Sequence, residues 1–228
     1  MKPLICLSAA LLLASPVRAA DNALTEQEKQ DGWVLLFDGR SLDGWMTSAG
    51  KPSRTPVQDG CINPHRCGAY MMVHQQKWTN FILSIDFKIS KGCNSGVFLR
   101  VDSLTPRINN DVGYNGIEVQ ILDSQTSGLH DTGAFYDLVK PTRNAMKPVG
   151  TWNRMIITCD KNLITVELNG AKVNRIDLDE WTVPNKRPDG SSHKFPEALK
   201  DHARTGYIGL QDHGADLWFK NIKLKPLN

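Results

Sequence analysis

Residues 116–123, Gly-Ile-Glu-Val-Gln-Ile-Leu-Asp, bring together side chains that could do acid–base chemistry. Their apolar residues alternate with others, which is the two-residue period of a half-buried strand, and this pattern predicts that Glu118 and Gln120 lie side by side on one face. Asp123 is out of phase with them, and a one-residue bulge after Ile121 would rotate its carboxylate onto the same face. We therefore expect a cleft for a polar ligand on this face. The alternative is a solvated outer face without a function.

Strand patterns dominate the rest of the chain. They are expected at residues 81–89, 97–101, 154–159, 163–168, 207–211 and 217–224. Asn169-Gly170 predicts a two-residue hairpin turn, and a slip in the apolar phase of the last strand predicts a bulge near Asn221. Helical patterns are short, one at 24–29 with Thr25 as its cap and one at 195–201. Many short strands with almost no helix predict an all-β fold in which two sheets pack as a sandwich.

The N-terminus and the charge balance narrow the class of protein. Residues 1–19 have the Lys, the short apolar run and the small-residue end of a secretory signal peptide, so we expect export to a bacterial periplasm. Residues 20–32 are expected to form a lead segment, and residues 33–228 a single domain. The chain has 27 Lys and Arg residues, two of which precede residue 20, against 24 Asp and Glu residues. This near neutrality argues against nucleic acid or a membrane surface as partner, and it leaves the oligomeric state open.

Four cysteines follow the predicted signal peptide: Cys61, Cys67, Cys93 and Cys159. Exported proteins form disulfides, and the short loop between Cys61 and Cys67 predicts a bridge there, with the other two thiols free. No paired Cys or His spacing indicates zinc. No cofactor is expected, although four aspartates could offer structural calcium the oxygen ligands that it prefers, namely Asp111, Asp123, Asp131 and Asp137.

A series of short motifs resembles one protein family. In chain order they are Leu-Phe-Asp-Gly-Arg-Ser-Leu-Asp-Gly-Trp (36–45), Asp-Phe-Lys (86–88), Asn-Ser-Gly-Val-Phe-Leu-Arg (94–100), the segment 116–123, Thr-Gly-Ala (132–134), Gly-Thr-Trp-Asn (150–153), Leu-Asn-Gly (168–170), Gly-Leu-Gln-Asp-His-Gly (209–214) and Trp-Phe-Lys-Asn-Ile (218–222). From about residue 33 to residue 227, the chain resembles the 3-keto-disaccharide hydrolase domain family. The resemblance implies a jelly-roll sandwich of the concanavalin A-like lectin and glucanase type, and a small carbohydrate as substrate.

The resemblance also implies a reaction that needs one base. A ketone at C3 of the sugar acidifies the hydrogen at C2, the base removes it, the C1 substituent leaves by β-elimination, and water adds back. Glu118 would be the base, and Gln120 would hold it or bind a sugar hydroxyl. Arg100 would stabilise the enolate or orient Glu118, or it could form a plain ion pair with Glu118. His213 would protonate the leaving group, unless residues 212–214 are merely a turn.

Further substrate contacts are expected from Tyr114, Tyr136, Gln211, Asp212 and Asp123, with the two aromatic rings suited to the faces of a sugar. Two other functions stay open, a non-catalytic carbohydrate-binding module and an endo-glucanase of the laminarinase type. The Glu-x-Gln-x-x-Asp motif departs from the Glu-x-Asp-x-x-Glu motif of laminarinases, and an amide cannot relay a proton between carboxylates, so the glucanase is disfavoured. The loop at 181–205 is long enough to be functional or disordered.

Overall fold

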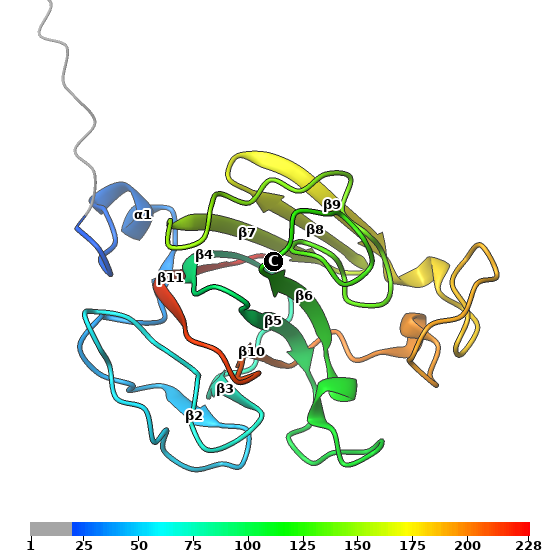
Figure 1. Cartoon of the computed structure of the whole chain (residues 1–228), viewed down its shortest axis with the longest axis horizontal. Coiled ribbons are helices and arrows are strands. Elements are labelled where there is room, and N and C mark those ends of the chain that lie inside the picture. Colours follow the sequence, from blue (N-terminus) through cyan, green and yellow to red (C-terminus); the bar gives the residue numbers. More distant parts are fainter. Residues whose placement is uncertain (1–19) are drawn as a thin grey trace, which may run out of the picture.

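The computed structural model describes residues 20–228, so the predicted signal peptide lies outside the described residues. Figure 1 shows two sheets packed face to face. One is six-stranded, in the order β1-β11-β4-β7-β8-β9, and the other is five-stranded, in the order β2-β3-β10-β5-β6. The strands are β1 (Val34–Leu35), β2 (Trp45–Thr47), β3 (Met71–His74), β4 (Phe81–Ile89), β5 (Asn94–Val101), β6 (Ile117–Leu122), β7 (Asn153–Asp160), β8 (Leu163–Leu168), β9 (Ala171–Asp177), β10 (Tyr207–Gln211) and β11 (Leu217–Pro226). Neighbouring strands are antiparallel, and the predicted all-β sandwich is confirmed.

Helices are few and short, as expected: α1 (Glu26–Gln30), and the 3-10 turns η1 (Val112–Asn115), η2 (Leu178–Glu180) and η3 (Leu199–Asp201). α1 begins with a capping box, in which Thr25 and Glu28 each accept from the other's backbone N–H. The helix expected at 195–201 was wrong, because the Phe195 carbonyl accepts from Asn185 N in the loop and η3 alone remains helical.

The two-residue period places one face of each strand in the core between the sheets. On β6 the core residues are Ile117, Val119 and Ile121, each fully buried. Burying each of these side chains contributes roughly 1.5–3 kcal/mol to stability. The opposite, outer face of the five-stranded sheet carries a smaller apolar cluster of Met71, Val73, Phe98, Val101 and Val112. Because side chains alternate along a strand, Glu118 and Gln120 lie on this outer face.

Local expectations for the turns hold. Asn169 and Gly170 both have positive φ, 52° and 81°, and they close the β8–β9 hairpin as an Asn-Gly turn does. The bulge near Asn221 is confirmed by its φ of 52° and a register shift between Lys220 and Lys223. At this bulge the backbone N–H groups of Asn22 and Asn221 each donate to the other's side chain, at 2.6 and 2.8 Å.

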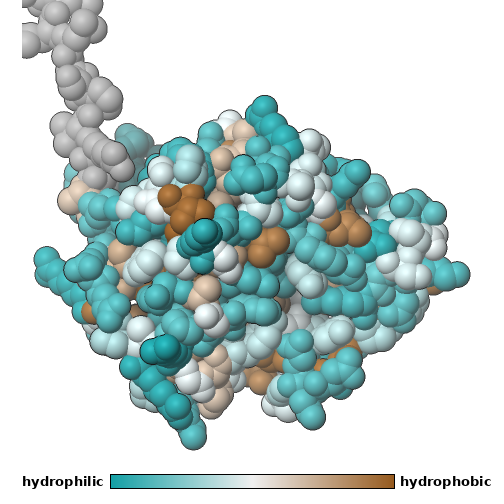
Figure 2. All heavy atoms as spheres, viewed as in Figure 1, coloured by the Kyte–Doolittle hydropathy of each residue, from teal (hydrophilic) through white to brown (hydrophobic). Residues whose placement is uncertain are grey.

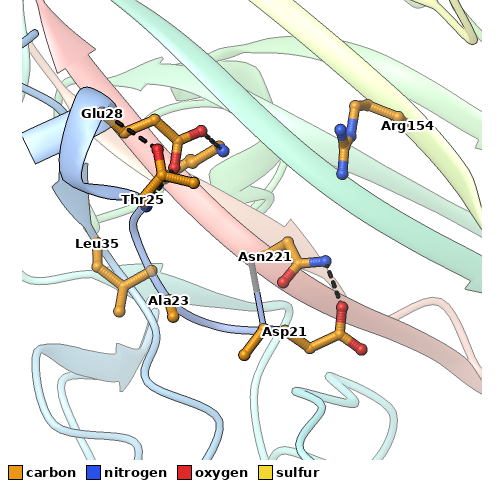
Figure 3. Close-up of a pocket in the computed structure, with 9 residues that line it drawn as sticks. Asp21, Ala23, Thr25, Glu28, Leu35, Arg154 and Asn221 are labelled. Atoms are coloured by element: carbon orange, nitrogen blue, oxygen red, sulfur yellow. Dashed lines mark hydrogen bonds and ion pairs between the residues drawn. The ribbon is translucent and has the colours of Figure 1, made fainter. Parts of the chain in front are cut away.

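The lead segment therefore docks on β11, on the six-stranded sheet. Figure 3 shows the small cavity left there, of about 150 Å³, between Thr25 and Glu28 on one side and Arg154 and Asn221 on the other. Its polar groups are partnered within the protein: Asn221 Nδ2 donates to Asp21 Oδ1 at 3.0 Å, and Lys223 pairs with Glu28. No residue of the strand β6 lines this cavity.

The disulfide expected between Cys61 and Cys67 was wrong. Both are buried free thiols, as are Cys93 and Cys159. The backbone of Cys61 forms an isolated antiparallel β-bridge with that of Gln58. The Cys61 thiol donates to Asp59 O at 3.4 Å, whereas the Cys67 thiol donates to Ala69 O at 3.3 Å. Each thiol is therefore directed to its own local carbonyl.

The face of the molecule shown in Figure 2 is largely hydrophilic, with small and separate hydrophobic spots. Within residues 20–228, no helix has the length and apolarity needed to cross a bilayer.

Candidate functional site

Glu118 lies on β6, and 4% of its surface is exposed. Across the strand pair, Glu118 faces Phe98 of β5, and Gln120 faces Gly96. A Cβ atom at Gly96 would lie 2.3 Å from Glu118 Oε1, so a glycine is required there for the carboxyl group to fit. The sequence of β5 therefore creates the space that this buried carboxyl group occupies.

Burial controls the protonation of Glu118. Loss of water raises its pKa from 4.5 to about 8, Asp111 adds to the rise, and the positive charge of Lys194 opposes it. A carboxyl group with this pKa gains and loses a proton close to neutral pH, which suits a general acid or base.

The side-chain amide of Gln120 lies beside this carboxyl group. With its nitrogen turned toward Glu118, the amide donates to Oε1 at 2.9 Å and to the Ser95 carbonyl at 3.2 Å. With its nitrogen turned away, it donates to Asn94 Oδ1 at 2.9 Å and leaves its oxygen facing Glu118. The first orientation suits an ionised Glu118, and the second suits a protonated one, because two facing oxygens need a proton between them. In the first orientation the Gln120 oxygen lies 2.9 Å from Asn94 Oδ1, so the Asn94 amide must turn as well to donate to it. When both amides turn together, Gln120 can hold Glu118 in both states.

Tyr136 reaches the site through a loop segment that pairs with the edge of β6. Tyr136 N donates to Glu118 O at 3.0 Å, and Phe135 forms an antiparallel bridge with Val119. Residues opposite each other in such a pair project from the same face, so the side chain of Tyr136 stands next to that of Glu118. Burial, and then the charge of Glu118, raise the pKa of the Tyr136 phenol. The hydroxyl therefore stays protonated and can donate a hydrogen bond to a ligand.

Tyr70, which precedes β3, and Gln211, which ends β10, form a second polar pair. Gln211 Nε2 donates to Tyr70 Oη at 2.8 Å. Gln211 Oε1 is buried and has no hydrogen-bond partner among the described residues, so it could accept from a ligand hydroxyl. Burial raises the pKa of Tyr70, and the charges of Glu118 and Asp111 raise it further, so this phenol lies near both carboxyl groups.

Lys194 supplies the positive charge of the site. Its Nζ lies 4.5 Å from the centre of the Tyr136 ring and 5.1 Å from the centres of the Tyr114 and Phe195 rings. Burial lowers the pKa of Lys194, and Glu118 is the leading charge that opposes this fall. Lys194 and Glu118 are therefore close enough for each to affect the charge of the other.

The loop that carries Lys194 is fastened to the protein through Asp137. Lys194 N donates to Asp137 Oδ2 at 2.7 Å, and Arg187 Nη2 donates to Asp137 Oδ1 at 3.1 Å. Asp137 directly follows Tyr136, so the loop and the β6 edge segment are joined beside the site. Of the predicted residues, the structure thus brings together Glu118, Gln120, Gln211, Tyr114 and Tyr136.

Arg100 is directed away from this group, so the role expected for it beside Glu118, in stabilising the enolate or orienting the base, was wrong, and the alternative ion pair with Glu118 is not formed either. A bulge in β5 places one extra residue between Phe98 and Val101, and Arg100 there has a φ of 52°. The bulge reverses the phase of the strand. The guanidinium is fully buried, Nη2 donates to Thr79 O at 3.3 Å, and Cys159 of the core lies near it.

The expected bulge after Ile121 is absent, because β6 stays in regular register with β5 up to Leu122. Asp123 therefore does not reach the face of Glu118. Its Oδ2 accepts from Gly92 N at 2.8 Å, which caps the turn between β4 and β5.

Asp212 and His213 lie on the turn after β10. Asp212 accepts from Arg66 N at 2.8 Å and from Gly214 N at 3.1 Å, so its carboxylate organises the turn and an adjacent loop. His213 is exposed and makes no hydrogen bond or ion pair with another described residue. The structure thus supports the turn, and gives His213 no contact with the group around Glu118.

No three His, Cys, Asp or Glu side chains within residues 20–228 gather as a metal site. The four aspartates considered for calcium form no such group and have other partners: Gly113 N for Asp111, Gly92 N for Asp123, Thr126 Oγ1 for Asp131, and Arg187 for Asp137.

Sequence reasoning missed Lys194 and Tyr70 as members of the site. The length of the loop at 181–205 was a signal that it could be functional, but no pattern distinguished Lys194 from its other basic residues. Tyr70 stands outside any motif quoted above, and its place depends on the pairing of β3 with β10.

Comparison with known proteins identifies the family. Residues 32–225 match the model of the 3-keto-alpha-glucoside-1,2-lyase-like domain. A 3-keto-disaccharide hydrolase of Bacteroides thetaiotaomicron is 29% identical over 231 residues, covering 87% of this chain and 79% of that protein.

Two solved structures from Parabacteroides distasonis, both described as candidate glycosyl hydrolases, have the same fold. The first has a TM-score of 0.77 and 27% identity, covering 92% of this chain and 100% of that chain. The second has a TM-score of 0.71 and 30% identity, covering 86% of this chain and 99% of that chain. The family match spans most of the sequence, including β5, β6 and the residues around Glu118, and the chain therefore belongs to the 3-keto-alpha-glucoside-1,2-lyase-like domain family.

Proposed function

We propose that this protein is a carbohydrate-acting hydrolase that cleaves 3-keto glycosides, with Glu118 as the base. The observation that carries the proposal is the buried Glu118 carboxyl group, whose pKa lies near 8 and which stands beside an amide and two phenols, with Asp111 as the neighbouring carboxylate that helps to raise its pKa. The named relative that acts on 3-keto-disaccharides supports the substrate class.

The reaction would proceed by elimination and hydration. Glu118 takes the proton from C2, the electrons of that C–H bond form an enolate with the C3 oxygen, and the enolate expels the C1 substituent as an alcohol after protonation. Water then adds at C1, so the net reaction is hydrolysis. A base with a raised pKa is favoured for this step because the proton transfer from carbon becomes less uphill.

The other polar groups would bind the sugar. Tyr136 and Tyr70 stay protonated and can donate to its oxygens, one of them to the departing alcohol, while Gln211 Oε1 can accept from a hydroxyl. A laminarinase mechanism is disfavoured, since Gln120 replaces the middle carboxylate of that motif and Asp123 serves a turn.

The test is incubation with 3-keto-trehalose and 3-keto-sucrose beside the unoxidised sugars. We expect products from the keto sugars alone, with solvent deuterium at C2 of the released keto sugar. Cleavage of unoxidised laminarin would instead indicate a conventional glucanase. Binding of keto sugars without any product would indicate a binding module.

We also propose that residues 1–19 direct export and that residues 33–228 work as one catalytic domain. The N-terminal sequence of the protein recovered from a bacterial periplasm tests the first point, with a start at Ala20 expected.

A further inference from the structure

The Lys194 ammonium group is held by the protein but is not hydrogen-bonded by it. Three aromatic rings surround Nζ, at 4.5 to 5.1 Å from their centres, and no described side chain or carbonyl accepts a hydrogen bond from it. Cation–π contacts fix where the charge lies but leave its N–H donors unused. A lysine in such a setting has donors available for a ligand oxygen.

Its position relative to the proposed base is also defined. Lys194 and Glu118 interact electrostatically, and both stand beside Tyr136, which pairs with β6 through its backbone and carries Lys194 over its ring. The ligand oxygen that Lys194 binds would thus lie close to the carbon atom from which Glu118 removes a proton.

We propose that Lys194 donates to the C3 carbonyl oxygen of the substrate and stabilises the enolate oxygen formed there; this inference rests on the function proposed above. When Glu118 removes the C2 proton, the electron pair of the C–H bond moves to the C2–C3 bond and the carbonyl π electrons move to oxygen. The negative charge develops on an atom adjacent to C2, where the Lys194 cation receives it. The total charge of Glu118 and the substrate does not change in this step, because the carboxylate is neutralised as the enolate forms.

Stabilisation of the enolate gives a function to the Lys194 ammonium group, which has no hydrogen-bond acceptor among the described residues. A carbonyl oxygen is a weak acceptor and an enolate oxygen is a strong one, so a donor held here gains most in the transition state. It also replaces Arg100, whose guanidinium is directed into the interior.

Asp137 is the positioning residue for this lysine. Its carboxylate accepts from Lys194 N and from Arg187, so it determines where the loop places Nζ. Exchange of Asp137 for Ala would release both contacts without removing any group that touches the substrate.

The test separates proton removal from departure of the leaving group. The probe is 3-keto-1,5-anhydroglucitol, which has a C2 hydrogen and a C3 ketone but no exocyclic substituent at C1, so that no alcohol can leave. Wild-type enzyme in heavy water should exchange deuterium into C2 of this probe. Lys194→Met should slow both the exchange and the turnover of 3-keto-trehalose about 10²- to 10³-fold, as expected for loss of an oxyanion donor.

Lys186→Met is the matched control, since Lys186 lies on the same loop with its side chain exposed, and it should retain wild-type exchange. Lys194→Arg should retain part of the exchange because it keeps the charge. Far-ultraviolet circular dichroism and the melting temperature verify that each variant is folded. Asp137→Ala should slow exchange less than Lys194→Met does.

A pH profile tests separately whether the charge of Lys194 acts on the proposed base. The charge of Lys194 holds down the pKa of Glu118, so Lys194→Met should shift the rise of kcat/KM with pH upward.

Wild-type exchange in a folded Lys194→Met variant would overturn the inference and leave Glu118 as base intact. So would loss of turnover with exchange retained, since Lys194 would then serve the leaving group. A stable adduct of the keto sugar on Lys194 after borohydride treatment would overturn it in favour of an imine. If wild-type enzyme neither exchanges C2 nor cleaves keto sugars, the proposed function itself fails.

Discussion

Replacing Glu118 by Gln should abolish turnover and, at alkaline pH, stabilise the protein. The variant keeps the shape of the side chain but can no longer ionise. The folded protein raises the pKa of this group from 4.5 to about 8, chiefly through burial. One pKa unit corresponds to about 1.4 kcal/mol, so the shift from 4.5 to about 8 corresponds to ~5 kcal/mol of unfolding free energy. We therefore expect the stability of Glu118→Gln relative to wild type to rise by about 3–5 kcal/mol between acidic and alkaline pH.

The sign follows from proton binding. Between pH 4.5 and about 8 the unfolded chain has lost the proton of Glu118 while the folded protein still holds it. The stability that comes from keeping the group neutral is therefore fully present below pH 4.5, falls as pH rises, and is lost above about 8. The Glu118→Gln variant would show no such loss, so the stability difference between variant and wild type should grow from pH 5 to pH 9.

The assay is urea unfolding of both proteins at pH 5, 7 and 9, beside turnover of a 3-keto disaccharide. Glu197→Gln is the control, because Glu197 is exposed and its replacement should change neither quantity. A stability difference that is the same at all three pH values would refute the buried, protonated state of Glu118. Turnover reduced by less than about tenfold would refute its role as base, since general bases contribute roughly 10²–10⁴.

Three further predictions test how the site is built. Gly96→Ala should lower turnover strongly, because the new Cβ would lie 2.3 Å from Glu118 Oε1 and must displace the carboxyl group. Unchanged kinetics would show that catalysis does not depend on the carboxyl group in this position. Arg100→Met should leave kcat/KM within about threefold of wild type. It should reduce the free energy of unfolding by no more than ~1 kcal/mol, because an unpaired buried cation stabilises little. Loss of catalysis in the folded variant would show that Arg100 does take part in the reaction. Tyr70→Phe should cost ~1 kcal/mol of stability and raise KM, since the Gln211 amide loses its acceptor; equal KM values would exclude a role for this pair in binding.

Local pattern predicted much of the fold. The two-residue period located β4, β6, β7, β8, β10 and β11, and Asn169-Gly170 located a hairpin turn. These features follow from the geometry of a single strand or turn, so neighbouring residues suffice to predict them. The same period correctly placed Glu118 and Gln120 on one face.

The local pattern could not predict on which face of the sheet the side chains near a strand's end lie. An extra residue in β5 turned Arg100 inward, and the regular register of β6 kept Asp123 off the face of Glu118. A bulge depends on the partner strand, and a shift of one residue reverses every side chain beyond it.

The sequence by itself therefore determined the sandwich and the pairing of a carboxylate with an amide on one strand. The tertiary structure decided the chemistry of that carboxylate, because burial against β5 raises the pKa of Glu118 and contacts distant in sequence bring Tyr70, Tyr136 and Lys194 to it. Solvent exclusion and charge proximity are properties of the packed molecule. No spacing along the chain specifies them.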